Sequence, residues 1–255
     1  RDGAPVGADA AGHPACRPRH RSGQGSAALP VGHRRPPCEQ FVPGYGDANA
    51  DFHVVGDHPG VHGGLARGVP FTGEPWSASF IDALRAAGLL TDGESDPTTG
   101  AEATEGSNPR AAADGAGDAA PFAVGKTFLS YRHMCLPADG DPTADAYADM
   151  ERFFDAELRA IAAHVLLPVG ARVTAHVLET YTAQAHKTEI DMDALHGTEL
   201  RGSGFLVVPI KDPADWTGDD ANRLVEGLRT LQRTDYRRET DLGRFIAGSD
   251  PYLVR

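Results

Sequence analysis

The sequence predicts an α/β fold: a single three-layer domain with a central parallel sheet of about four strands. Short apolar runs, which are typical of buried strands, alternate with segments whose apolar residues recur every three or four positions. Strands that alternate with helices favour parallel pairing, because the connecting helices then cover both faces of the sheet. The chain has 255 residues, of which 40% are hydrophobic, so it can bury one sizeable core.

Residues 1–38 differ in composition from residues 39–255, which we assign to the predicted domain. The first segment is rich in Pro, Gly, Arg and His and lacks a periodic apolar pattern. It holds six arginines against two aspartates, whereas the remainder holds 18 basic and 34 acidic residues. We therefore expect this segment to be disordered, either as a flexible basic arm or as a spurious start that is not part of the natural protein.

The first half of the predicted domain contains two strands and two helices. A turn-rich lead-in precedes an apolar strand at residues 52–55. A helix follows at 74–87, where apolar residues recur at three- and four-residue steps and a glycine ends the pattern. Residues 91–121 are almost devoid of apolar side chains, and we assign them to a low-complexity insertion. Strand character returns at 126–135, before a long amphipathic helix at 142–163.

The second half repeats the alternation of strands and helices. A short apolar strand is expected at residues 165–167, and a Pro-Val-Gly turn leads into a helix at 171–181. Residues 183–200 are ambiguous. The last clear strand covers 205–210, where Phe, Leu, Val and Ile dominate, and the last helix covers 219–231. We expect the remaining tail to pack against the domain without a motif.

A sharp turn is expected where the first strand ends, at Gly56-Asp57-His58-Pro59-Gly60. Glycine supplies backbone angles that other residues avoid, and proline cannot continue a strand ladder. Open α/β sheets bind their ligands at the carboxyl ends of parallel strands. Asp57 and His58 are therefore candidate functional residues at the mouth of a crevice. The plain alternative is a strand-to-helix loop with two polar surface residues.

This turn, followed by Gly68-Val69-Pro70-Phe71-Thr72-Gly73, resembles the first motif of the uracil-DNA glycosylase superfamily. The resemblance is closest to the iron–sulfur, family 4-like branch, whose pattern runs Gly-Glu-Ala-Pro-Gly and then Gly-x-Pro-Phe-x-Gly. It extends in outline over residues 39–232, as in a divergent member. It implies base flipping and hydrolysis of the N-glycosidic bond of uracil or another deaminated base in DNA, in base excision repair. It also places Gly56, Pro59 and Gly60 among the substrate-binding residues.

The resemblance implies roles for three further residues of this motif. Phe71 would be the aromatic face on which the flipped base stacks, with ordinary core packing as its alternative. Asp57 takes the position of the glutamate that orients or activates water in the iron–sulfur branch. His58 takes the next position, where the best-known branch of the superfamily has its catalytic aspartate. Either side chain can do acid–base chemistry, and of the two we favour Asp57.

Two later segments depart from the family pattern. The family has Val-Pro and then x-x-His-Pro-Ser, and the matching segment here is Val208-Pro209-Ile210-Lys211-Asp212-Pro213-Ala214. Asp212 replaces a histidine that donates to a uracil carbonyl, and an ionised aspartate cannot donate. Lys211 is a candidate replacement for that cation, but adjacent side chains of an extended segment point to opposite faces. Tyr131 falls where the family has its base-reading asparagine, so it is either a base-binding residue of different selectivity or a core aromatic. Lys211, Asp212 and Tyr131 complete the candidate substrate-binding residues.

The three cysteines, Cys16, Cys38 and Cys135, are too few and too scattered for a disulfide scaffold, and we expect reduced thiols. The iron–sulfur branch implies a cluster held by four good ligands, usually thiolates. By resemblance Cys135 would be the third ligand and Met150 falls near the fourth, while the Cys-x-x-Cys pair of the family is missing. We therefore predict no metal site and no intact iron–sulfur cluster.

The net charge of −12 is built with only three lysines, so nearly all the positive charge is arginine. Acidic surfaces of this kind suit a cytoplasm of high salt, and a halophilic source is our hypothesis. The implied partner is DNA that contains uracil or another deaminated base. Because the acidic balance of the chain repels phosphates, any DNA site must be a local cluster of arginines.

No apolar run approaches the ~20 residues that cross a bilayer, and no signal peptide is recognisable. We therefore expect a cytoplasmic protein without membrane contact that acts as a monomer. Two other functions stay open at this point. One is a glycosylase fold that has lost catalysis and binds nucleic acid or a nucleotide only. The other is a hydrolase of another small nucleoside-like substrate.

Overall fold

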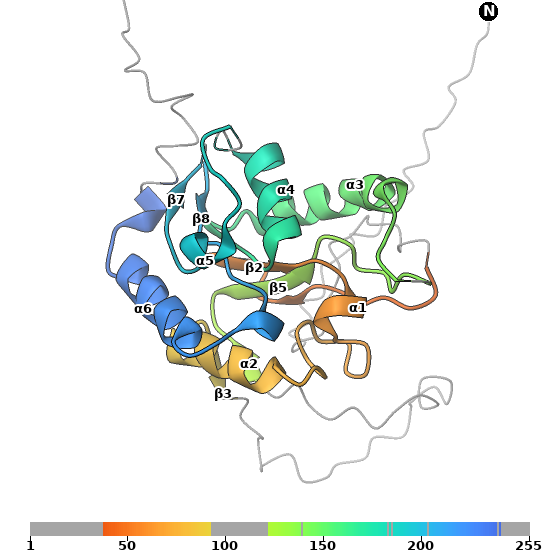
Figure 1. Cartoon of the computed structure of the whole chain (residues 1–255), viewed down its shortest axis with the longest axis horizontal. Helices are drawn as coiled ribbons and strands as arrows, with labels where there is room; N and C mark the ends of the chain where they lie inside the picture. The colour runs from red at the N-terminus through yellow and green to blue at the C-terminus, as the bar shows by residue number, and fades with distance from the viewer. Residues whose placement is uncertain are drawn as a thin grey trace, which may run out of the picture.

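The computed structural model describes residues 38–92, 122–138, 140–182, 184, 186–202, 204–238 and 240 (Figure 1). The expectations for residues 1–37, for nearly all of the insertion and for the end of the tail lie outside the described residues. Cys38 is described and is covalently linked to Cys135, so this residue belongs to the domain and not to the segment before it.

A six-stranded sheet forms the middle layer, in the strand order β1-β5-β2-β6-β8-β7 (Figure 1). The four inner strands run parallel to one another, which confirms the predicted sheet. They are β5 (Thr127–Tyr131), β2 (Phe52–Gly56), β6 (Val165–Pro168) and β8 (Leu206–Val207). The outer strands β1 (Tyr45–Gly46) and β7 (Leu200–Arg201) pair antiparallel with their neighbours. They were not predicted, because two residues are too few to show an alternating pattern.

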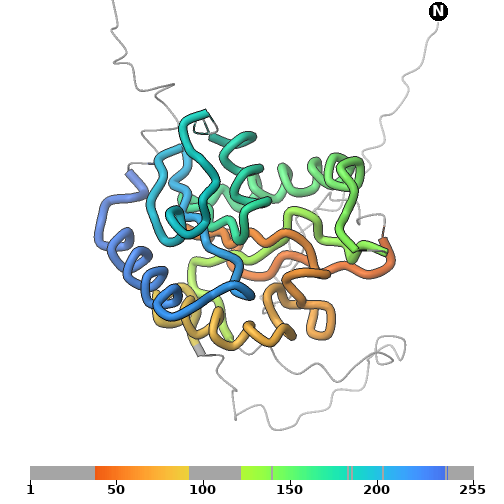
Figure 2. Tube along the Cα trace, in the orientation of Figure 1, coloured from red at the N-terminus to blue at the C-terminus, as the bar shows by residue number. Residues whose placement is uncertain are grey.

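Helices cover both faces of the sheet (Figures 1 and 2). Helices α2 (Ser77–Ala86) and α6 (Asp220–Gln232) lie side by side on one face. Helices α3 (Ala144–Ile161) and α4 (Ala171–Tyr181) lie on the other. All four bounds lie within three residues of the predicted helices. Three shorter helices complete the domain: α1 (Pro59–His62), α5 (Met192–Leu195) and a 3-10 turn at Pro213–Asp215.

Neighbouring residues of each inner strand face opposite layers. Val54 and Leu167 are buried in the core formed with α2 and α6, whereas Val55 and Leu166 are buried against α3 and α4. Because both faces are covered, these strands are mostly apolar and do not alternate, and the few polar residues in them, such as His53 and Ser130, are buried. The parallel register brings the carboxyl ends of β5, β2 and β6 to one edge of the sheet, and the candidate residues follow there.

A hairpin adjoins the predicted low-complexity insertion. Strand β3 (Leu90–Asp92) pairs antiparallel with β4 (Phe122–Val124), and together they form a separate two-stranded sheet. The insertion therefore begins later than predicted, since residues 91 and 92 belong to a strand. Residues 93–121 lie outside the described part of the chain.

A buried trio of polar side chains links β2, β5 and α3. The Nε2 atom of His53 lies 2.8 Å from the hydroxyl oxygen of Ser130 and 3.8 Å from a carboxylate oxygen of Glu157. Burial raises the pKa of Glu157 to about 7, an effect that the Ser130 hydroxyl partly offsets. Burial also lowers the pKa of His53 to about 3. Both groups are therefore largely uncharged in the folded protein below pH 7.

Glu157→Gln is expected to stabilise the protein more as the pH rises. Between the ordinary carboxyl pKa of 4.5 and about 7, the folded state holds a proton on Glu157 that the unfolded chain has released, so this group destabilises the fold with rising pH. His53 is neutral in the folded state but protonated in the unfolded chain below pH 6.5, so its contribution to stability increases as the pH rises to that value. In the wild type this increase masks the loss of stability that Glu157 causes. The difference in unfolding free energy, variant minus wild type, should grow by about 2–3 kcal/mol from pH 5 to pH 8. Urea titrations at both pH values measure it, with the exposed Glu226→Gln as control. A difference that does not change with pH contradicts the assignment.

Candidate active site

Asp57 is the first residue after β2, and its carboxylate is buried. Two side chains from the helix layer formed by α3 and α4 hold this carboxylate. The Tyr147 hydroxyl of α3 donates to Oδ1 over 2.6 Å. Nη1 of Arg172, at the start of α4, donates to Oδ2 over 3.0 Å. A charge-assisted pair of this kind fixes the orientation of the carboxylate and stabilises its ionised form. The sequence placed Asp57 at this edge correctly but identified neither partner.

Arg172 ties two carboxylates and a phenol together. Its Nη2 donates to Asp141 over 2.7 Å, and its Nη1 also reaches the Tyr147 hydroxyl at 2.9 Å. Hydrogen bonds to Asp141 and Tyr147, together with the charge of Asp57, raise the pKa of Arg172 above its usual value. Burial and the contact with Asp57 raise the pKa of Tyr147, which keeps its hydroxyl proton for donation. Arg132 adds a second cation at this point, with its guanidinium 4.3 Å from the centre of the Tyr147 ring.

His58 uses both ring nitrogens within the protein. Its Nδ1 accepts from the Gly60 N–H over 3.2 Å and so caps α1, and its Nε2 lies 3.3 Å from Oδ1 of Asp141. Burial lowers the pKa of His58 although Asp57 and Asp141 favour its charged form. The neutral ring therefore carries its proton on Nε2. This geometry supports a role for His58 in holding the turn, and its role in acid–base catalysis stays a prediction.

The turn itself is shaped by the packing beneath it. A Cβ atom on Gly56 would lie 2.7 Å from the Tyr131 ring and 2.8 Å from Nδ1 of His62, so only glycine fits. Pro59 is the first residue of α1, where its missing N–H costs nothing. Gly60 supplies the N–H that His58 accepts. The three predicted turn residues therefore shape the backbone around Asp57.

Phe71 and Tyr131 form a buried pair next to this turn, and each is only 1% exposed. Phe71 has a positive φ of 64°, and its N–H donates to the Tyr131 hydroxyl over 2.7 Å. That hydroxyl also lies 2.8 Å from the backbone carbonyl oxygen of His62. The Phe71 ring packs against the rings of Phe80, Tyr131 and His62 at centroid distances of 5.1, 5.3 and 5.6 Å. Both side chains have the core packing that we gave as their alternative, and a base that stacks on Phe71 has to replace one of these contacts.

His62 was not identified from the sequence, yet it lies between Phe71 and the Asp57 turn. Its Nδ1 accepts from the Asp57 backbone N–H over 2.9 Å. Its Nε2 lies 3.4 Å from Oδ2 of Asp212. An imidazole ring therefore fills the space between Asp57 and Phe71, where a flipped base in contact with both residues would have to lie. The only signal in the sequence was a histidine two positions after the Gly-Asp-His-Pro-Gly turn.

Lys211 and Asp212 point in different directions, as expected for an extended segment. Nζ of Lys211 lies 2.6 Å from Asp193 and 3.4 Å from Asp220, so two carboxylates already neutralise this cation. The side chain of Asp212 leaves the same extended segment on the other side and contacts His62. Both residues line a cavity of about 410 Å³, together with Ala171 and the segment around α5. Asp212 thus lies beside His62 at the candidate site, whereas Lys211 forms ion pairs with Asp193 and Asp220 next to it.

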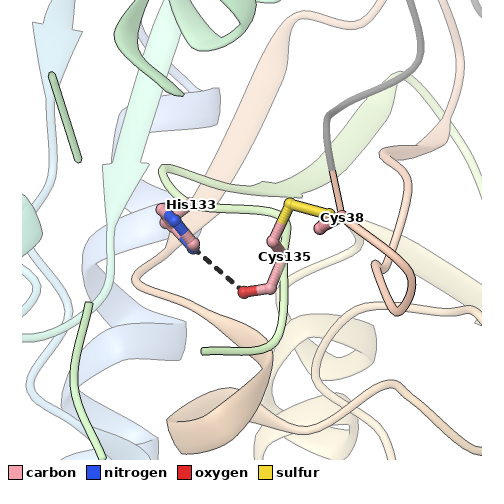
Figure 3. Close-up of a disulfide and its surroundings, with 3 residues drawn as sticks. All are labelled: Cys38, His133 and Cys135. Atoms are coloured by element: carbon pink, nitrogen blue, oxygen red, sulfur yellow. Dashed lines mark hydrogen bonds between the residues drawn. A yellow bond between two sulfur atoms is a disulfide. The ribbon is translucent and has the colours of Figure 1, made fainter. Parts of the chain in front are cut away.

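A disulfide joins Cys38 to Cys135, with a Cα–Cα distance of 6.0 Å (Figure 3). Our expectation of reduced thiols was wrong for these two residues, because the chain brings the start of the domain against the segment that follows β5. The carbonyl oxygen of Cys135 also lies 2.9 Å from Nδ1 of His133 (Figure 3). Met150 packs in the same apolar cluster.

The residues around this disulfide do not fit an iron–sulfur cluster. A cluster needs four good ligands, and here two sulfur atoms are consumed by their own bond while the thioether of Met150 falls near the position expected for the fourth ligand. Within the described ranges, no group of three or more His, Cys, Asp or Glu side chains is arranged to hold a metal ion.

The family comparison agrees with this fold. The model of the uracil DNA glycosylase superfamily matches residues 43–224, more than two thirds of the chain. The chain belongs to this superfamily. No curated protein matches it significantly. Superfamily membership suggests a DNA glycosylase-like function and DNA as the binding partner. Among the described helices, none is long and apolar enough to cross a membrane.

Proposed function

We propose that this superfamily member is a DNA glycosylase that hydrolyses the N-glycosidic bond of uracil or another deaminated base. The observation that carries the proposal is the Asp57 carboxylate. It is buried at the carboxyl end of β2, and Tyr147 and Arg172 hold both of its oxygens. By resemblance, Asp57 occupies the position at which the iron–sulfur branch has the carboxylate that orients or activates water.

The reaction requires a flipped nucleotide whose sugar lies over this edge of the sheet. The C1′–N bond breaks with its electron pair moving to the base, and positive charge develops on the sugar. A fixed carboxylate stabilises that charge and accepts a hydrogen bond from the water that attacks C1′. The water adds its oxygen to C1′ and releases a proton, which neutralises the departing base anion. Arg172 and Tyr147 supply donors to Asp57, so the geometry suits a negative stabiliser of the transition state and not a proton donor. Arg172 is already paired with Asp57 and Asp141, so Arg132, which lies over the Tyr147 ring, is the cation at this point that we assign to a DNA phosphate.

A second candidate is a glycosylase fold that binds nucleic acid or a nucleotide without cleaving it. Three observations favour it: Asp212 stands in place of the family histidine, the Tyr131 hydroxyl is occupied by backbone groups, and Phe71 is covered by neighbouring rings. In this case the Asp57 network holds the turn in shape and has no role in chemistry.

Single-turnover assays distinguish these two functions. Wild-type protein is incubated at high salt with oligonucleotides that contain one uracil, hypoxanthine or xanthine, and with matched thymine and cytosine controls. The glycosylase proposal expects release of at least one deaminated base, and an Asp57→Ala protein purified in parallel controls for a contaminating enzyme. DNA binding without release of any of these bases supports the binding module. Equal release by both proteins assigns the activity to a contaminant and overturns the glycosylase proposal.

A further inference from the structure

The imidazole of His62 is a buried ring with an unsatisfied donor. The side chain is 1% exposed and is surrounded by the rings of Phe71, Trp76 and Tyr131 at centroid distances of 5.6, 5.9 and 6.3 Å. The Cβ of any residue other than glycine at position 56 would collide with it. The surrounding rings therefore fix the position of the imidazole.

The hydrogen bond at Nδ1 determines the tautomer of this ring. Since the Asp57 N–H donates to Nδ1, a neutral ring must carry its proton on Nε2. That Nε2–H has no hydrogen bond to any described residue. Its near neighbour is Oδ2 of Asp212 at 3.4 Å, close enough for an ion-pair contact but not aligned as a hydrogen bond. A buried donor left unsatisfied is costly, and a missing ligand is one physical reason for it.

Asp212 supplies a charged acceptor beside this donor. Its Oδ1 accepts from the Ala214 N–H over 3.0 Å and caps the 3-10 turn, which leaves Oδ2 toward His62. Burial alone would raise the pKa of Asp212, but the contacts with His62 and the Ala214 N–H lower it. The carboxylate is only partly exposed and borders the cavity of about 410 Å³ described above.

We propose that His62 and Asp212 read the edge of the flipped base. The Nε2–H of His62 donates to a ring carbonyl oxygen, and Oδ2 of Asp212 accepts the adjacent ring N–H. This inference rests on the proposed function, because it names the base contacts of that site. A carbonyl beside a ring N–H occurs in uracil, hypoxanthine and xanthine, the products of deamination. Cytosine and adenine present a ring nitrogen acceptor beside an amino donor, which reverses the order of the two groups.

The His62–Asp212 pair also gives a role to the aspartate that replaces the family histidine at position 212. Asp212 cannot donate to a carbonyl as the family histidine does, but it takes up the complementary task of accepting an N–H. The lost donor is supplied by His62, from helix α1 after β2 and not from the loop after β8. Thymine and guanine carry the same edge, so the pair rejects cytosine and adenine but does not distinguish thymine and guanine from the deaminated bases.

Two methylated bases test the contact without turnover. 1-Methyluracil keeps a carbonyl beside the N3–H, whereas 1,3-dimethyluracil keeps the carbonyls but has no ring N–H. We expect 1-methyluracil to shift the Nε2–H resonance of His62 in ¹H–¹⁵N spectra of the histidine rings and to bind at least about tenfold more tightly than 1,3-dimethyluracil. Equal binding of the two, or no binding of either at millimolar concentration, overturns the proposal.

A matched pair of variants separates the two nitrogens of the ring. His62→Asn keeps an acceptor near Nδ1 for the Asp57 N–H but loses the donor at Nε2, whereas His62→Gln keeps a donor near Nε2. We expect His62→Asn to weaken 1-methyluracil binding about tenfold and His62→Gln to retain most of it. Asp212→Asn, which still caps the 3-10 turn, should abolish the preference for 1-methyluracil over 1,3-dimethyluracil. Wild-type affinity in His62→Asn overturns the proposal.

Cleavage assays on the same variants keep this inference distinct from the proposed function. If wild type cleaves no DNA but the methyluracil results hold, the glycosylase proposal fails and the base-reading pair stands. If wild type cleaves uracil DNA and His62→Asn cleaves it at the same rate and KM, the glycosylase proposal stands and the base-reading pair fails.

Discussion

Asp57→Asn is expected to lower the single-turnover rate on the best deaminated substrate by about 10²–10⁴-fold. The amide has nearly the shape of the carboxylate but no charge to stabilise the sugar cation and weaker capacity to orient water. Binding should not weaken, because a negative charge near the DNA phosphates is removed. Rapid-quench rates and fluorescence anisotropy measure the two quantities separately. A rate loss that is matched by an equal loss of affinity would instead indicate a positioning role.

Asp141→Asn is the matched control for this experiment. Asp141 shares Arg172 with Asp57, but it is more exposed and belongs to the loop before α3. Its replacement loosens Arg172 while the carboxylate next to β2 is kept, so we expect a rate loss of no more than about tenfold, in line with a surface ion pair. Thermal melts of both variants check the fold. A similar loss in Asp57→Asn and Asp141→Asn would contradict a special role for Asp57.

Removal of the Cys38–Cys135 disulfide is expected to destabilise the domain by roughly 4 kcal/mol. The cross-link closes a loop between residues 97 positions apart, so it removes much conformational freedom from the unfolded chain. For a chain of this size the melting temperature should fall by roughly 10 °C. Melts with and without a phosphine reductant, and of a Cys38→Ser/Cys135→Ser double variant, measure the effect.

Cys16→Ser is the control, because it removes a cysteine and leaves the disulfide intact. A chelator should have no effect on the melting temperature of the wild type. Brown protein from an anaerobic purification with about four iron atoms per chain would show that these sulfurs ligate a cluster in the cell. Insensitivity to the reductant would show that the disulfide does not contribute to stability.

The inner sheet and its helices could be predicted because their sequence signals are local. Strands β2 and β6 are buried on both faces and therefore appear as apolar runs, which only His53 interrupts. Helix α4 was located to the residue, since a Pro-Val-Gly turn marks its start. The edge strands β1 and β7 give no such signal, because two paired residues depend on their neighbour and not on their own pattern.

Only part of the candidate site could be predicted, because only part of it has a local signal in the sequence. Asp57 could be located because the glycines and the proline that form its turn are its neighbours in the sequence. Its partners Tyr147 and Arg172 lie 90 and 115 positions away, and only the crossover of α3 and α4 over the sheet brings them to it. Tyr147 lies on the buried side of the predicted amphipathic helix, but an amphipathic pattern does not reveal a hydroxyl contact. His62 bonds to the Asp57 backbone five positions earlier, but a single histidine carries no periodic pattern, so spacing could not distinguish it from a loop residue.

The backbone of Phe71 has a consequence for the divergence of related sequences. Its left-handed conformation costs on the order of 1–3 kcal/mol in a residue other than glycine, and here it is accompanied by a hydrogen bond from its N–H to the Tyr131 hydroxyl. A relative that exchanges the tyrosine for a side chain without that oxygen loses this restraint. Positions 71 and 131 should therefore co-vary across homologues, with glycine or asparagine at the first wherever the second lacks a polar group.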